Sequence, residues 1–262
     1  MNRPLILVTN DDGFDSIGIA ALVEVAQKFG EVVVVAPDSH QSGMSHAITM
    51  SKPLRLKEVN NFGVSKGYKC SGTPVDCVKI ALAKVVDRKP DLCVSGINHG
   101  SNASVNVIYS GTVAAAMEAA IEGINSIGFS LLNFSSDANM DTSKFVVEKI
   151  IAETLKKGIS DANLLNINIP NVDVEQLKGF KICRQAKGNW HEEFDSRTDP
   201  FGRKYYWLTG KYIYEDSGDD NDIWALEHNY VSIVPVSYNL TAKKSVQSLQ
   251  ENWTLNSSTI AL

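Results

Sequence analysis

The sequence lacks the long hydrophobic run that a membrane-spanning helix requires. No window approaches roughly 18 unbroken apolar residues. The first residues, Met1 to Pro4, run directly into an apolar stretch without the charged and hydrophobic regions of a secretion signal. An excess of basic residues is also missing, because 25 Lys and Arg face 30 Asp and Glu and give a formal net charge of −5. We therefore expect neither a membrane nor duplex nucleic acid as a partner.

Cysteine is scarce, and its spacing carries no metal or redox signature. The chain has four cysteines, and no two of them form a C-x-x-C pair. They lie in apolar or mixed stretches, at Cys70, Cys77, Cys93 and Cys183. This pattern predicts reduced thiols in the core and a cytoplasmic protein, with disulfides or metal ligation as the alternatives.

Several common motifs of nucleotide and hydrolase chemistry are absent. The sequence has no G-x-x-x-x-G-K-[ST] phosphate loop, no G-x-G-x-x-G after its first apolar run, no G-x-S-x-G elbow and no H-E-x-x-H pair. The run from Asp11 to Phe14 does not have the ligand spacing of an EF-hand. Any phosphate or metal chemistry must therefore come from a different arrangement of residues.

What the sequence does have is a regular alternation of strand-like and helix-like segments. Apolar runs of strand length alternate with stretches whose apolar residues recur at helical spacing. The strands are expected at residues 5–8, 31–36, 92–94, 127–132 and 164–169, and the helices at 16–29, 74–86, 112–122 and 144–157. The 262 residues suffice for one α/β domain with an appended subdomain. We predict a doubly wound, mostly parallel sheet.

The pattern changes after Pro170. Residues 180–240 are rich in aromatic side chains, which indicates an extended β-hairpin or a small β subdomain. The region holds more rings than a single chain needs to expose, so we expect it to mediate self-association. In the tail, Val246, Leu249 and Trp253 recur at helical spacing and predict a short docking helix. The expected organisation is a catalytic core over residues 1–175, a β-rich hairpin region over 176–240 and a C-terminal docking helix within 241–262.

Three loops carry small polar clusters at the ends of predicted strands, at residues 10–13, 37–43 and 95–102. In an open parallel sheet such loops meet at one rim, where ligands bind. In the first loop, Asp11 and Asp12 follow a wholly apolar strand, and adjacent carboxylates repel each other unless a cation lies beside them. Oxygen ligands suit a hard ion such as Mg²⁺ or Mn²⁺ rather than zinc. We favour a metal site over the alternative, a simple Asp-Gly turn.

Two Ser-Gly-Thr triplets precede predicted helices. After Ser71-Gly72-Thr73, Asp76 supplies the acid of a capping box, so plain helix capping is the favoured interpretation. Ser110-Gly111-Thr112 opens a helix whose first turn has no carboxylate, and its free N–H groups and hydroxyls could hold a phosphate. Plain capping explains Ser110 equally well from the local sequence.

The histidines give weaker signals. His46 and His99 could orient a phosphate or carry a proton, although loop histidines are more often only solvated. The other three, His40, His191 and His228, are interpreted as structural or surface residues.

In combination, these motifs resemble those of the SurE family, the stationary-phase survival proteins that are metal-dependent 5′/3′-nucleotidases. The resemblance covers residues 5–13, 35–43, 71–77, 95–102 and 109–113, and later residues 222–225 and 230–233. Two positions depart from the family pattern, because Ser104 and Asn229 stand where Gly is frequent. Since Asn tolerates a left-handed backbone, the turn at Asn229 is expected to survive.

The resemblance implies a Rossmann-like domain with a C-terminal hairpin region used to form a homodimer or homotetramer. It implies one divalent ion, held by the residues Asp11, Asp12, Ser42 and Asn98. It places the substrate phosphate near Asn102, Ser110, Gly111 and Thr112. It also implies hydrolysis of nucleoside 5′- and 3′-monophosphates, and in some members of short polyphosphate.

The expected chemistry is metal-assisted attack of water on phosphorus. Asp11 or Asp12 would bind the ion, and the less engaged of the two would accept the proton of the water. Two other functions stay open at this point. A metal-dependent nucleotide-sugar transferase would need a second substrate pocket. A non-catalytic nucleotide sensor would bind nucleotide with or without release of phosphate.

Overall fold

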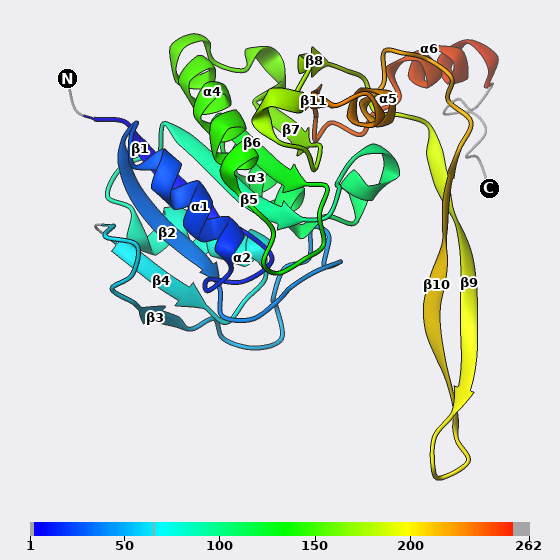
Figure 1. Ribbon diagram of the computed structural model, residues 1–262, viewed down its shortest axis with the longest axis horizontal. Coiled ribbons are helices and arrows are strands. Elements are labelled where there is room, and N and C mark those ends of the chain that lie inside the picture. The colour runs from blue at the N-terminus through cyan, green and yellow to red at the C-terminus, as the bar shows by residue number, and fades with distance from the viewer. Residues whose placement is uncertain (1–2, 65, 254–262) are drawn as a thin grey trace, which may run out of the picture.

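A nine-stranded sheet forms the centre of the computed structural model, which describes residues 3–64 and 66–253 (Figure 1). The strand order is β3-β4-β2-β1-β5-β6-β7-β11-β8. The parallel strands are β1 Leu5–Thr9, β2 Glu31–Pro37, β4 Lys66–Cys70, β5 Leu92–His99, β6 Ser126–Leu131 and β7 Leu164–Ile169. At one edge β3 Leu56–Glu58 pairs antiparallel with β4, and at the other β11 Tyr230–Pro235 runs antiparallel to β7 and parallel to β8 Gly179–Ile182. The predicted mostly parallel sheet is confirmed.

Two pairs of helices cover the faces of this sheet. Ile6 and Val8 pack in the core under α1 Ile17–Ala26 and α4 Asp141–Lys157. Leu5 and Leu7 point to the other face, under α2 Pro74–Ile80 and α3 Gly111–Ile121. Successive strand residues face opposite sides, so a strand covered on both sides is apolar throughout. This burial explains why the first strand could be recognised from its uninterrupted apolar run.

The helix starts follow the predicted capping chemistry. The Thr73 hydroxyl oxygen accepts from the Asp76 N–H at 3.1 Å, and Asp76 Oδ2 accepts from the Thr73 N–H at 2.9 Å, which completes the capping box. Ser110 caps α3 by accepting from the Val113 N–H at 3.0 Å. The predicted helix over 74–86 is α2 followed by a π-helical turn, Ala81–Val85.

The remaining helical segments are short. Turns of 3-10 helix cover Ser104–Ile108, Ser160–Ala162 and Val174–Gln176, α5 spans Asp222–Glu227, and α6 spans Lys243–Asn252. Every residue of α6 is exposed. The docking of this helix against another surface therefore stays a prediction. Within the two described ranges, no helix is long and apolar enough to cross a bilayer. The four cysteines are buried and unpaired, as predicted.

A two-stranded antiparallel hairpin projects from the core (Figure 1). Its strands are β9 Gly188–Thr198 and β10 Lys204–Tyr214, and they lie outside the main sheet. Large side chains are exposed along it, including Phe194, Phe201, Tyr206, Trp207 and Leu208. The predicted hairpin is confirmed. The range 176–240 also holds β8 and β11, which extend the main sheet.

The base of the hairpin is held by a cluster of charges. The Arg184 guanidinium forms ion pairs with Asp216 at 2.6 Å and with Asp220 at 2.8 Å. The Lys187 N–H donates to Asp216 Oδ2 at 2.9 Å. The chain therefore leaves for the hairpin and returns from it at nearly the same point.

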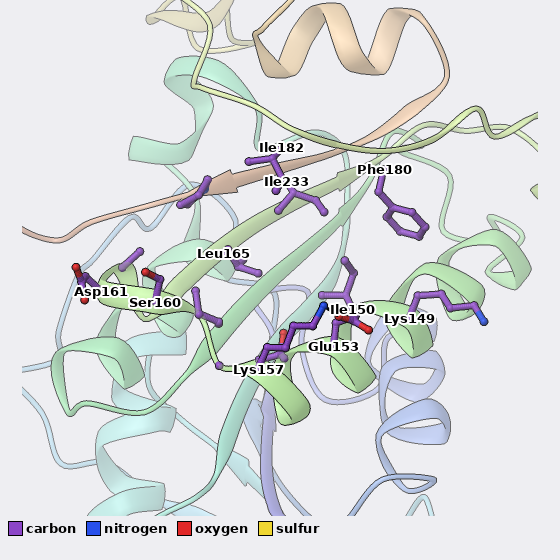
Figure 2. A pocket seen from close by; sticks show the side chains of 15 residues that line it. Lys149, Ile150, Glu153, Lys157, Ser160, Asp161, Leu165, Phe180, Ile182 and Ile233 are labelled. Carbon is purple, nitrogen blue, oxygen red and sulfur yellow. Dashed lines mark ion pairs between the residues drawn. The ribbon is translucent and has the colours of Figure 1, made fainter.

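An apolar cavity of about 700 Å³ lies beside α4, away from the predicted site (Figure 2). Ile150 lines it from α4, Leu165 from β7, Phe180 and Ile182 from β8, and Ile233 from β11. It reaches the loop that precedes β7, whereas the polar loops follow the carboxyl ends of the strands. None of the predicted site residues lines this cavity.

Candidate active site

The loop after β1 is locked into a tight turn at the carboxyl end of the sheet. The Asn10 amide donates to the Gly13 carbonyl at 2.9 Å and to Ser16 Oγ at 2.8 Å. The Phe14 N–H donates to the Pro37 carbonyl at 2.9 Å, which ties this loop to the end of β2. Gly13 has φ 94°, a left-handed conformation that glycine adopts without strain. Asp11 and Asp12 are thus presented by a rigid turn.

Asp11 lies against the start of α3. It is 3% exposed, and the Thr112 hydroxyl donates to its Oδ1 at 2.5 Å. A Cβ on Gly111 would lie 2.9 Å from the Asp11 Cβ, so glycine is needed for this approach. Burial raises the pKa of Asp11 from 3.8 to about 6, against the lowering effect of the Thr112 hydroxyl, and the charge of Asp12 adds to the rise. The structure therefore joins a predicted metal ligand to the predicted phosphate residues.

Asp12 points to the other side and faces two histidines. Its Oδ2 accepts from the His99 N–H at 3.2 Å and lies 3.1 Å from His99 Nδ1. His40 Nδ1 is 3.9 Å from Asp12 Oδ1, although the sequence analysis assigned His40 only a structural or surface role. These three residues and the carboxylates of Asp15 and Asp38 line a cavity of about 500 Å³. The sequence feature that could have marked His40 as a site residue is its position in the loop after β2.

The other two predicted metal ligands come from separate loops. A shift in the pairing of β5 with β6 between Ser95 and Asn98 marks a bulge, a feature that redirects side chains at strand ends. The Asn98 amide donates to the Gly100 carbonyl at 2.8 Å, which leaves its oxygen as the free ligand atom. Ser42 is exposed, and in the described residues it forms no hydrogen bond with Asp11, Asp12 or Asn98. Its neighbour Gln41 donates from its N–H to the Asp11 carbonyl at 2.8 Å.

Asn102 belongs to a buried network of amides. Its N–H donates to Asn168 Oδ1 at 2.8 Å, and its side-chain amide donates to Ser130 Oγ at 2.9 Å. The Asn166 amide in turn donates to the Asn102 carbonyl at 2.9 Å. An amide nitrogen carries two donors, so Asn102 has one amide N–H besides the one that bonds Ser130. The asparagines of β7 were not anticipated as its supports.

His46 has a buried partner that the sequence did not indicate. His46 Nε2 lies 2.9 Å from Glu118 Oε2, and the Lys79 ammonium donates to Glu118 Oε1 at 2.5 Å. Glu118 is on α3 and Lys79 is on α2. The pair with Glu118 anchors the loop after β2 to the helix that begins at Ser110. The histidine therefore has a structural role, whatever else it does.

The comparisons decide which family this arrangement represents. The family model described as Survival protein SurE matches residues 6–192. The chain belongs to the SurE family. A protein named 5′-nucleotidase SurE from Flavobacterium psychrophilum is 55% identical over 258 residues, which cover 98% of this chain and 100% of that protein. Its namesake from Christiangramia forsetii is 55% identical over 256 residues, 97% of this chain and 98% of its own.

Solved structures give the same assignment. The crystal structure of the SurE protein from Aquifex aeolicus matches with a TM-score of 0.82 at 37% identity, and covers 95% of this chain and 99% of that one. The resemblance to the SurE family that the motifs indicated is thus confirmed along nearly the whole chain.

The two departures from the SurE pattern both occupy left-handed positions, with φ 53° at Ser104 and 61° at Asn229. Ser104 is buried, and its hydroxyl donates to the Ala186 carbonyl at 2.8 Å. Its N–H donates to Asp222 Oδ2 at 2.8 Å. The serine therefore keeps the backbone that glycine would adopt and adds a link from the loop beside Asn102 to the base of the hairpin.

The donor set of this SurE chain fits a divalent cation. Asp11 and Asp12 are adjacent and largely buried, and among the residues described neither forms an ion pair with Lys or Arg. The oxygen of the Asn10 amide and His99 Nε2 are buried without a hydrogen-bond partner. No three His, Cys, Asp or Glu side chains gather as a metal group in the described chain. The predicted set needs only two carboxylates, because amide and hydroxyl oxygens complete it.

Proposed function

We propose that this chain is a phosphomonoesterase that depends on a divalent metal ion and hydrolyses nucleoside 5′- and 3′-monophosphates to nucleoside and phosphate. The relatives at 55% identity carry the name 5′-nucleotidase SurE, and they align over nearly the whole chain. Mg²⁺ or Mn²⁺ is the proposed ion, because the ligands offered are oxygens. Short polyphosphate is a secondary substrate in this proposal.

The observation that carries the proposal is the contact between Asp11 and the start of α3. A carboxylate at a helix N-terminus would by itself repel a phosphate that approaches the same N–H groups. A divalent ion held by the acidic pair would remove this conflict, and it would also account for an acidic pair that forms no ion pair with Lys or Arg in the described residues. The contact supports Asp11 as a ligand beside a phosphate at Gly111 and Thr112. In this proposal Asp12, Ser42 and Asn98 complete the ligand set, and Asn102 and Ser110 complete the phosphate site.

In this mechanism the chain binds and orients the phosphate. The N-terminus of α3, through its dipole, and the remaining amide N–H of Asn102 would attract phosphate oxygens, where charge grows during the reaction. A divalent ion held by Asp11, Asp12, Ser42 and Asn98 would supply Lewis-acid chemistry at this site. The Thr112 hydroxyl holds the Asp11 carboxylate in one orientation, so Asp11 would be a preorganised metal ligand.

We assign Asp12 as the group that accepts the proton of the attacking water. Asp11 is enclosed and engaged by Thr112, whereas Asp12 lines a cavity and keeps Oδ1 on the side of His40. His99 holds the other carboxylate oxygen from two nitrogen atoms. Asp12 thus keeps one carboxylate oxygen on the side of the cavity, and this geometry allows it to accept a proton from solvent there.

The test is release of phosphate from AMP with and without added Mg²⁺ or Mn²⁺. We expect metal-stimulated release by the parent and a loss of at least about two orders of magnitude in Asp12→Asn, the scale of losing a key electrostatic group. A transferase would need an acceptor before it released anything, and a sensor would bind AMP without turnover. Absence of phosphate release with either metal would reject the proposal.

We also propose self-association through residues 180–240, as a homodimer or homotetramer. The exposed rings on β9 and β10 support this proposal, because a two-stranded ribbon has no second layer of its own to cover them. A cytoplasmic location is proposed from the four unpaired thiols.

A further inference from the structure

A third cavity opens where the base of the hairpin meets the segment before α3. It measures about 500 Å³ and is lined by Tyr109, Trp190, Glu192, Leu208, Thr209 and Gly210. The mechanism above uses none of these residues. Tyr109 directly precedes Ser110, the cap of α3, and consecutive Cα atoms lie about 3.8 Å apart. The cavity therefore begins one residue away from the proposed phosphate site.

Two aromatic rings of this cavity are open to solvent, and the ring of Trp190 is held in place. Tyr109 is 53% exposed, and its carbonyl accepts from the Ser45 N–H at 3.2 Å. Trp190 is 39% exposed, and its indole N–H donates to Asn106 Oδ1 at 2.8 Å. The ring of Tyr212 meets Trp190 edge-on, with centroids 5.7 Å apart. These contacts position the Trp190 ring before a ligand arrives, which lowers the entropic cost of stacking on it.

The charge of the cavity selects the end of the substrate that can enter it. Of the six described residues that line it, Glu192 alone is charged, and its carboxylate disfavours a phosphate. A nucleobase is planar and uncharged at neutral pH, and it stacks on aromatic rings whatever its identity. We infer that this cavity takes the nucleobase of the substrate while its phosphate lies at Ser110 to Thr112. This inference rests on the proposed function and identifies the substrate class as nucleotides of any base, favoured over sugar phosphates.

Another ring near the rim offers a competing platform. Phe134 is 85% exposed, lies against Gly100 and lines the cavity beside Asp12. That cavity also contains the ring of Phe14, but it has three carboxylates, those of Asp12, Asp15 and Asp38. The cavity at Tyr109 offers two rings beside a single carboxylate, so it provides the less polar surroundings for an uncharged base.

The experiment compares AMP with ribose 5-phosphate, which has the same phosphate and sugar but no base. Tyr109→Ala is expected to lower kcat/KM for AMP at least about fivefold, mainly through a higher KM, because stacking is made in the ground state as well. It should change kcat/KM for ribose 5-phosphate less than about twofold. Tyr109→Phe keeps the ring and should retain the AMP preference. Phe134→Ala is the matched aromatic control and should also retain it.

Equal losses for both substrates in Tyr109→Ala would overturn the inference, as would a selective loss for AMP in Phe134→Ala. A change of mass in sedimentation, accompanied by equal losses, would assign Tyr109 to an interface instead and would also overturn it.

A binding measurement separates this inference from the proposed function. Adenosine has no phosphate, and we expect it to quench tryptophan fluorescence in the parent and much less in Trp190→Phe. This signal needs no turnover, so it tests the base site even if AMP is not hydrolysed. Equal quenching in both proteins, or none in either, would reject the base site.

Discussion

Replacing Asp11 by Asn is expected to stabilise the metal-free protein at neutral pH while it abolishes hydrolysis. Burial raises the pKa of Asp11 from 3.8 to about 6. Because the folded pKa lies above the unfolded one, the native state binds this proton more tightly than the unfolded chain does. The stability that protonation supports is complete below about pH 4, falls as the pH rises toward 6, and is absent at pH 8.

The size of the effect follows from the pKa. A rise of about two pH units corresponds to at most about 3 kcal/mol in the free energy of unfolding. Asn keeps the shape of Asp and an oxygen that accepts from the Thr112 hydroxyl, but it carries no charge. In a chain of this length, 1 kcal/mol shifts Tm by about 2–4 °C. The variant should therefore gain several degrees, and at most about 12 °C, at pH 8.

The assay is thermal unfolding in EDTA at pH 4 and pH 8, followed by circular dichroism. The gain of Asp11→Asn over the parent should be present at pH 8 and small at pH 4. Mn²⁺ should raise the Tm of the parent and not that of the variant. Asp161→Asn makes the same chemical change at an exposed carboxylate and should show no such pattern. An equal difference between variant and parent at both pH values would refute the reasoning.

Thr112→Val should lower kcat about tenfold or more, because it removes a hydroxyl that donates to a carboxylate, whereas Thr112→Ser keeps that hydroxyl. Equal kcat in these two variants would argue against the contact. Chelation by EDTA should abolish turnover reversibly without changing circular dichroism, because the sheet is held by its apolar core. Collapse of the spectrum on chelation would contradict this. Sedimentation at micromolar concentration should give an oligomer, since the rings of the hairpin are exposed. A monomer under these conditions would remove the case for self-association.

Local signals carried most of the fold. Leu5 to Val8 form one unbroken apolar run, and the loop that follows changes abruptly to carboxylates, so both the strand and the acidic pair could be predicted. The capping box at Thr73 is likewise complete within four residues. The local sequence of β11 does not indicate that this strand runs antiparallel to β7, because strand pairing depends on distant partners.

The candidate site could be predicted only in part for the same reason. The first turn of α3 has no acid of its own, yet Asp11 approaches it from 101 residues away in the sequence. His46 meets Glu118 over 72 residues. Neither contact is visible in periodicity or composition, because both result from the order in which the strands are arranged. The residues were found from their chemistry, but their partners required the structure.

Because the hairpin is closed at its base, its length can change without affecting the rest of the molecule. Lys187 and Asp216 are joined there, so the chain re-enters the core where it left. Paired residues can be added or deleted at the tip, two on each strand, without changing the alternation of faces or the path of the sheet. Each added residue extends a strand by about 3.4 Å. The length of the hairpin, and with it the reach of the proposed interface, can therefore change while the loops at the carboxyl ends of the strands stay as they are.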